Sequence, residues 1–516
     1  MGTLIVGAGV LAWALRAESA PVPRGQIGRK PRIHPDYTDI VIPPNIAPLN
    51  FAIQETGTHY FVTISAPQGA VIERFSRTGR VTIPMKAWRR LLEANRGQDL
   101  HIDALVQRES GSWEAYATVT NHIAEADVDG YLVYRKMHPI HTLFYGPVGL
   151  YQRDLHTYDE TLILDKSYWG EGGCINCHSF CQNRPDKAVI GVRSPQYGNA
   201  TLLIDAESAD KIDAKFGYSS WHPSGRLVTY SVDNLPMFFH TSGQEVRDTV
   251  DLDSLLAYYL VDRQVLKTAG PLARKDRLET WPCWSAEGRY LYFCSAPLLW
   301  SDTQEIPPPT YRDVRYDLVR IPYDLEQDQW DDQETVVSAA DTGKSAGMPR
   351  TSPDGRWLSF CLSDYGFFPT WQSGSDLYLV DLHAERIDGR LPCAKLAANS
   401  DRSESWHSWS SNSRWLAFSS KRDCGVFTRL YLSYIDPNGC ASKPFILPQK
   451  DPRFYDSCLY AYNTCELTVA PMQTGKERLG RIVRRSKAIA VDLPVTQATP
   501  KAGLGVGTPQ GPPERE

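Results

Sequence analysis

The five residues Cys174-Ile175-Asn176-Cys177-His178 carry the clearest chemistry in the sequence. Two thiols separated by two residues can form thioethers with the vinyl groups of a haem, and the histidine after them can bind the iron as its proximal ligand. This spacing is the signature of covalent c-type haem attachment. It predicts one haem c, joined to Cys174 and Cys177, with His178 on the iron.

Zinc binding and thiol-disulfide exchange are the alternative interpretations of a Cys-x-x-Cys pair. A zinc site needs two further ligands, usually a second close Cys/His pair, and no such pair recurs at that spacing in the sequence. A thioredoxin-like pair is expected between a strand and a helix, whereas the glycine-rich residues 170–173 and β-like flanks surround this one. The motif therefore favours haem.

The second axial position of such an iron takes a histidine or a methionine. The sequence offers several candidates without choosing among them, since a lone His or Met is more often a packing or hydrogen-bonded residue. They are Met137, His222, Met237, Met348 and His407. A methionine ligand would imply a higher reduction potential than a histidine ligand.

Length and charge limit the remaining possibilities. The 516 residues exceed one usual domain and suggest two. A net charge of -5 gives no long-range attraction for nucleic acid, so nucleic acid is not expected as a partner.

Residues 1–20 resemble a secretory signal, with an apolar run from Leu4 to Leu15 and small residues after it. A truncated membrane anchor, which would associate the chain with a membrane through its N-terminus, is the alternative. Export to the periplasm or beyond agrees with the motif, because bacteria attach c-type haem outside the cytoplasm. Beyond Cys174 and Cys177 the chain has an odd number of cysteines, so at least one is expected to stay free or to pair between chains; Cys181 is the first candidate.

The segment before the motif is rich in strand patterns. Residues 30–125 contain alternating apolar runs that predict a β-sandwich-like domain, with one amphipathic helix over residues 85–95. Residues 126–180 are expected to hold connecting strands and the haem-binding segment. The motif would then lie at the junction between the N-terminal domain and the second half of the chain.

The second half of the chain repeats one hairpin pattern. A tight turn, then arginine and an apolar strand, occurs at residues 220–227, 283–290, 350–357 and 407–415. Proline, Asp or Ser, and glycine suit the corners of such turns. Each unit precedes a further strand pattern, near residues 258–262, 316–321, 376–381 and 429–434. Repetition of this kind predicts propeller blades, with the repeated tryptophans in the core.

The unit Ser352-Pro353-Asp354-Gly355-Arg356 and its copies resemble the blade repeat of TolB-type β-propellers. The resemblance implies an all-β chain in which residues 181–470 form a propeller of six blades, closed by strands from 131–164 and by 461–463. A related group of exported bacterial TolB-like proteins, some cytochrome-related, shares the placement of a Cys-x-x-Cys-His run before the first blade. The copy at 409–414 departs from the pattern with Asn412-Ser413 in place of Asp-Gly.

The tail, residues 476–516, begins with a basic stretch that predicts a short helix, and from Pro494 onward its Pro/Gly-rich composition predicts disorder. A solvated helix face is the ordinary expectation for it, and docking on an acidic partner is the alternative.

Taken together, the sequence predicts an exported mono-haem c-type protein that exchanges electrons with a redox partner. No acid/base pair, nucleophile triad or phosphate loop can be placed, so an electron carrier or binding protein is expected rather than a catalyst. The alternatives are a TolB-like scaffold that binds envelope proteins around a structural haem, and a haem enzyme with an open iron site.

Overall fold

In the computed structural model, residues 20–138, 148–170, 173–206, 208–240, 245 and 247–491 are described. The signal-like run Leu4–Leu15 and residues 492–516 lie outside these ranges. The regular secondary structure of the described residues is almost entirely strand, which confirms the all-β prediction. The helices within these ranges are too short and too polar to span a bilayer.

The N-terminal part contains two sheets and one helix. The first sheet has seven strands: five follow the order β1-β9-β8-β10-β3, β5 also pairs with β8, and β6 pairs with β5. The second sheet has the order β2-β4-β7. The helix α1 (Met85–Ala94) agrees with the predicted helix and buries Trp88, Leu91 and Leu92. The strands are β1 (Gly25–Ile27), β2 (Ile33–His34), β3 (Val41–Ile42), β4 (Phe51–Ile53), β5 (His59–Ser65), β6 (Ile72–Ser76), β7 (Arg80–Val81), β8 (Asp99–Gln107), β9 (Trp113–Tyr116) and β10 (Val119–Ile123).

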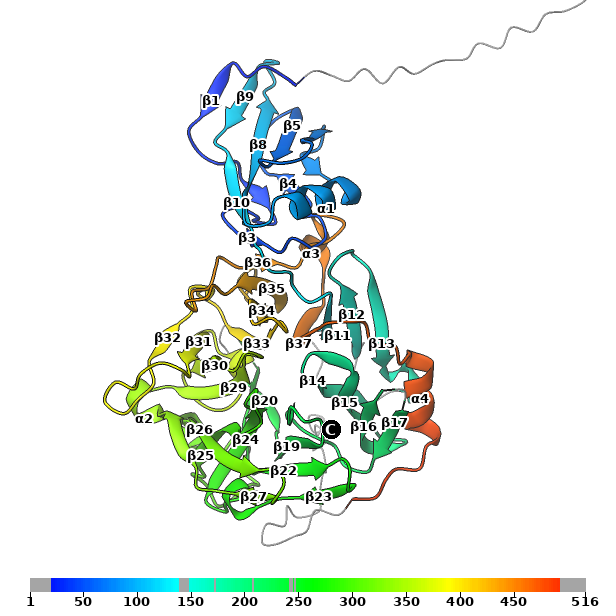
Figure 1. Ribbon diagram of the computed structural model, residues 1–516, viewed down its shortest axis with the longest axis vertical. Coiled ribbons are helices and arrows are strands. Elements are labelled where there is room, and N and C mark those ends of the chain that lie inside the picture. Colours follow the sequence, from blue (N-terminus) through cyan, green and yellow to red (C-terminus); the bar gives the residue numbers. More distant parts are fainter. Residues whose placement is uncertain are drawn as a thin grey trace, which may run out of the picture.

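Six antiparallel sheets come next along the chain and surround a common centre (Figure 1). Five are consecutive in sequence: β14 (Cys174–Cys181), β15 (Arg184–Ser194), β16 (Gly198–Asp205), β17 (Ser208–Ile212); β18 (Ser219–Trp221), β19 (Leu227–Asp233), β22 (Ser254–Leu260), β23 (Val265–Lys267); β24 (Arg277–Trp284), β25 (Tyr290–Pro297), β26 (Asp317–Asp324), β27 (Gln329–Trp330), β28 (Glu334–Val337); β29 (Ser345–Thr351), β30 (Trp357–Ser363), β31 (Asp376–Asp381), β32 (Cys393–Lys395); and β33 (Glu404–Trp409), β34 (Trp415–Ser420), β35 (Arg429–Tyr434), β36 (Phe445–Ile446).

The remaining sheet joins distant parts of the chain. Strand β37 (Ala461–Thr468) pairs with β11 (Tyr131–Met137), which continues into β12 (Val148–Asp154) and β13 (Glu160–Asp165). The inner strands β14, β18, β24, β29, β33 and β37 contact one another in this order, and β37 also contacts β14. The six sheets therefore form a ring that begins at Tyr131, so the expected connecting strands are part of it. A short hairpin, β20 (Met237–Phe239) with β21 (Arg247–Thr249), extends from the ring.

The repeated turns join four of the six inner strands, β18, β24, β29 and β33, to the second strand of their sheets. Gly225, Gly288 and Gly355 adopt φ of 70°, 78° and 74° there, and each amide donates to the carbonyl three residues earlier. In the divergent copy Ser413 takes the same place, with φ 61° and a 2.9 Å hydrogen bond to Ser410. The predicted hairpins are thus present, and serine accepts a conformation that glycine adopts more easily.

The repeated tryptophans are core residues, as predicted. They are Trp221, Trp284, Trp357, Trp409 and Trp415, and none is more than 6% exposed. Trp415 also joins the two parts of the molecule, because its indole N–H donates to the Ala126 carbonyl at 3.0 Å. The N-terminal part therefore rests on the sheet of β33–β36.

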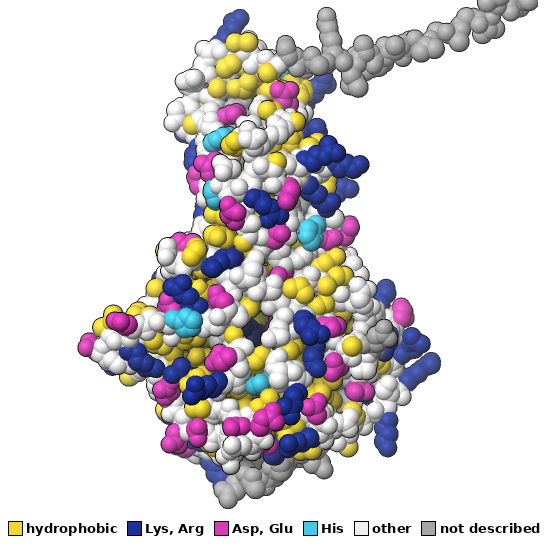
Figure 2. Space-filling model, in the orientation of Figure 1, with side chains coloured by type: hydrophobic (Ala, Val, Ile, Leu, Met, Phe, Trp, Pro, Cys, Tyr) yellow, Lys and Arg dark blue, Asp and Glu magenta, His cyan; other side chains and the backbone are white. Residues whose placement is uncertain are grey.

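The basic stretch of the tail forms α4 (Lys476–Arg485), with α2 (Ala339–Thr342) and α3 (Phe454–Ser457) as the other short helices of the described chain. Helix α4 buries Leu479 and Val483 against the ring and turns its cations outward. Figure 2 shows dark-blue side chains gathered over this helix.

The closing strand offers a matched test of the ring. Leu467 of β37 is buried opposite Leu132, whereas Val469, just beyond the strand, is 49% exposed. Leu467→Ala should lower the free energy of unfolding by about 2–5 kcal/mol, because it leaves a cavity in the core. Val469→Ala should change it by less than about 0.5 kcal/mol. Urea unfolding monitored by tryptophan fluorescence measures both, and equal effects would contradict the closure of the ring by β37.

Candidate functional site

The motif Cys174–His178 lies on an inner strand of the ring. It forms most of β14, and Cys174, Cys177 and His178 are 1%, 5% and 5% exposed. Strands β11, β12 and β13 come between the N-terminal domain and this strand in the sequence, and they form a sheet of the ring together with β37. The motif is therefore at the centre of the ring rather than at the expected junction.

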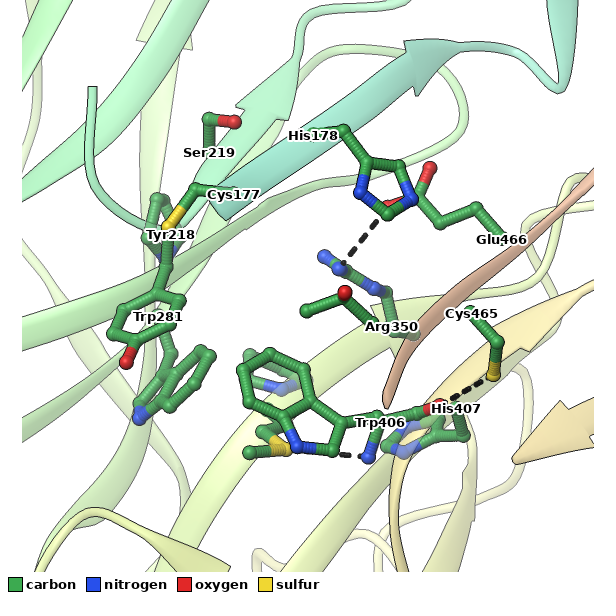
Figure 3. A pocket seen from close by; sticks show the side chains of 14 residues that line it. Cys177, His178, Tyr218, Ser219, Trp281, Arg350, Trp406, His407, Cys465 and Glu466 are labelled. Atoms are coloured by element: carbon green, nitrogen blue, oxygen red, sulfur yellow. Dashed lines mark hydrogen bonds and ion pairs between the residues drawn. The ribbon is translucent and has the colours of Figure 1, made fainter. Parts of the chain in front are cut away.

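A hollow lies where the inner strands meet (Figure 3). Each of the six inner strands contributes residues to its wall, and Tyr218, just before β18, also lines it. Cys177 and His178 line the hollow, whereas Cys174 does not.

A local distortion repeats in five of the six inner strands. Each has a register shift at a residue with positive φ that is not glycine, and each of these residues lines the hollow: Cys177, Trp281, Met348, Trp406 and Thr464, with φ from 47° to 58°. Such bulges re-aim the neighbouring side chains. The next residue of each strand also lines the hollow: His178, Pro282, Pro349, His407 and Cys465.

His178 is held as a neutral imidazole. Burial, and to a smaller extent the charges of Arg135 and Arg350, lowers its pKa to about 3, and a hydrogen bond to the Val133 backbone opposes this shift. Its Nε2 is buried and has no hydrogen-bond partner among the described residues. The neutral ring with a free nitrogen is the form in which histidine binds metals.

His407 repeats this environment on β33. Burial and the charge of Arg350 lower its pKa to about 3, and the Ser359 backbone opposes the shift. Its Nδ1 lies 4.0 Å from the Cys361 sulfur, while its buried Nε2 has no partner in the described part of the chain. The hollow thus has two neutral imidazoles, each with an uncommitted nitrogen.

Between the strands that carry these imidazoles lies an ion pair. Arg350 Nη2 is 3.4 Å from Glu466 Oε1, and the other carboxylate oxygen accepts the Phe180 amide at 3.1 Å. Burial raises the pKa of Glu466, and Arg350 counteracts that rise. Figure 3 shows the His178 ring directed toward the Arg350 side chain.

An aromatic wall covers another side of the hollow. Tyr218 stacks on Trp281 with ring centroids 3.6 Å apart, and Trp406 meets Trp281 edge-on at 5.5 Å. Apolar walls with a few convergent polar groups are typical of cofactor sites.

The thiols of the motif are uncombined and buried. All eleven cysteines lie within the described ranges and none forms a disulfide. Burial raises the pKa of Cys177, so this thiol is protonated at neutral pH. The Cys174 sulfur lies 4.0 Å from Arg135 Nη1, which also donates to the Asn176 side chain at 2.7 Å. Cys181, at the end of the strand, lies 3.7 Å from the His222 carbonyl.

These residues fit a c-type haem. Two uncombined thiols and an imidazole come from one strand, the free imidazole nitrogen is buried at the hollow, and an aromatic wall is present. The buried, unpartnered Nε2 of His178 agrees with such a group, because a polar atom buried without a partner is unfavourable unless something binds it.

The other candidate iron ligands separate into two groups. His407 and Met348 line the hollow. His222 does not, and its two nitrogens bond Ser224 and the Gly288 carbonyl at 2.7 and 2.9 Å. Met237 and Met137 also lie outside the lining, on β20 and at the end of β11.

The sequence did not indicate Arg350 or Glu466 as site residues. Arg350 was visible as the first residue of a repeated turn unit, and Glu466 came after the stretch expected to close the ring. An alignment of the repeats against the strand that contains His178 would have placed both at the centre.

Comparisons with known proteins identify no family. No family model and no curated protein sequence matches the chain. Among solved structures, puromycin hydrolase matches with a TM-score of 0.34 and 13% identity over 62% of this chain, which spans 46% of that protein. Oligogalacturonate lyase from Vibrio parahaemolyticus matches with 0.32 and 10% over 60% of this chain and 92% of its own. Hydrazine synthase from Kuenenia stuttgartiensis matches with 0.27 and 10% over 49% of this chain and 75% of its own.

Two arginines allow the electrostatics of the site to be tested in protein whose Cys174 and Cys177 are replaced by Ala. Arg350→Met should raise the pKa of both His178 and His407 above about 3, because the lost positive charge no longer disfavours the imidazolium. Arg135→Met should raise the pKa of His178 alone. NMR titration of the imidazole signals measures these shifts. A shift of both histidines in Arg135→Met, or of neither in Arg350→Met, would show that the arrangement is wrong.

Proposed function

We propose that the chain is an exported mono-haem c-type protein in which a six-bladed, TolB-type β-propeller encloses the haem and exchanges electrons with a partner protein. Cys174 and Cys177 would hold the haem covalently, and His178 would bind the iron. The observation that carries the proposal is the buried, unpartnered Nε2 of His178 at the central hollow, one residue after a free cysteine thiol.

The ring would tune such a group through its surroundings. The bound haem would supply a one-electron iron couple, whose potential depends on axial ligands, burial and nearby hydrogen bonds. The hydrogen bond from His178 to the Val133 backbone would orient the ring and hold its free nitrogen toward the iron. The tryptophans and tyrosine of the wall would keep water from the macrocycle.

Export and partnership agree with the same chemistry. Thioether formation outside the cytoplasm is consistent with the signal-like residues 1–20. The partner would be a redox protein or an envelope protein that approaches the ring. The acidic net charge again argues against nucleic acid.

Covalent haem can be tested within one strand. The wild-type protein, expressed with a haem attachment system and exported, should gain the mass of one haem and show a haemochrome spectrum. Cys174→Ala with Cys177→Ala should abolish covalent haem, because no thioether can form. Cys181→Ala is the matched control, since this buried thiol lies on the same strand and should leave attachment unchanged. Folded wild-type protein without haem would refute the proposal.

Measurements on the protein with its haem attached can distinguish an electron carrier from a haem enzyme and from a scaffold with a structural haem. An electron carrier should be reduced and reoxidised reversibly, and its ferric form should resist cyanide because both axial positions are filled. Rapid cyanide binding would favour a haem enzyme with an open iron site instead. A haem that cannot be reduced while partner binding persists would favour a scaffold with a structural haem.

A further inference from the structure

We infer that His407 is the second axial ligand, so that the iron is held between two histidines from different sheets. The inference rests on the proposed function and specifies its coordination. It identifies one residue among the five candidates that the sequence left open.

His178 and His407 occupy equivalent positions. Each comes directly after a residue with positive φ, Cys177 with φ 58° and Trp406 with φ 50°. In both strands the pairing skips two residues at the same place, between Asn176 and Ser179 in β14 and between Ser405 and Ser408 in β33. The same distortion therefore directs both imidazoles into the hollow, whose wall contains both.

The two strands lie on either side of the same neighbour. Both β14 and β33 contact β37, which contributes Cys465 and Glu466 to the wall. One inner strand therefore separates the two histidines, and Arg350 acts on the charge of both rings. A single group in the hollow can be approached by both.

The nitrogen that each ring offers is also the same. Both Nε2 atoms are buried without a hydrogen-bond partner among the described residues, while Nδ1 of His407 lies 4.0 Å from the Cys361 sulfur. An imidazole held at one nitrogen presents the other to a metal. A histidine that served packing alone would not need this arrangement twice in one hollow.

The other lining candidates are committed elsewhere. The Met348 sulfur accepts the Trp406 amide at 3.4 Å, and the Cys465 thiol donates to the Trp406 carbonyl at 2.8 Å. Glu466 is paired with Arg350. Among the described residues of the wall, the uncommitted basic nitrogens are those of His178 and His407.

Substitution of His407 in the haem-loaded protein tests the inference. Wild type should show the low-spin electron paramagnetic resonance spectrum of two imidazole ligands. His407→Gly should become high-spin and bind cyanide, and added imidazole should restore the low-spin signal. His407→Met should keep a low-spin iron but raise the reduction potential, because methionine ligation favours the ferrous state. His222→Gln is the control and should match wild type, since His222 lies outside the hollow.

Each failure has a distinct meaning. If wild type carries no haem, the proposed function itself is wrong. If haem is attached but His407→Gly and His407→Met both retain the wild-type spectrum and potential, another residue is the ligand and the inference is overturned. Loss of folding in the glycine variant leaves the methionine variant to decide, because Met preserves most of the side-chain volume.

Discussion

The arrangement of the centre depends on a strained backbone position that recurs in the inner strands. In a regular strand successive side chains alternate between the two faces, so neighbouring residues cannot both point toward one axis. A bulge at a residue with positive φ breaks this alternation. Holding a non-glycine residue in that region costs roughly 1–3 kcal/mol, and such strain persists where the surrounding structure fixes it, often at functional sites. Five such positions surround one hollow here.

The rest of the ring makes that strain tolerable and gives it a use. Short turns fix the register of four of the inner strands, and the buried tryptophans fill the space between sheets. Strand β37 returns from the end of the ring to pair with β11, so the hollow is surrounded on all sides. The enclosed position removes His178 and His407 from water, and Arg350 adds a positive charge nearby. Both effects keep the imidazoles neutral and free to bind.

The sequence predicted the parts of this structure that are local. The turn units have their own residue signatures, so the hairpins, their second strands and the buried tryptophans could be located before the structure was known. The haem inferred from the Cys-x-x-Cys-His spacing stays a prediction. Even the divergent turn at Ser413 closes as its neighbours do.

The position of the motif at the ring centre was missed, because strands from both ends of the ring had to meet before β14 became an inner strand. The bulges have no common residue type, so nothing in the sequence distinguished His407, which comes after one, from His222, which does not. Arg350 and Glu466 come together from strands more than a hundred residues apart.

Anomalous diffraction at the iron absorption edge, from crystals of the exported protein, would locate the iron directly. The proposal predicts a single iron in the hollow, bonded to Nε2 of His178, with continuous density from the macrocycle to the sulfur atoms of Cys174 and Cys177. An iron outside the ring, or a hollow without iron beside two unmodified cysteines, would contradict this account.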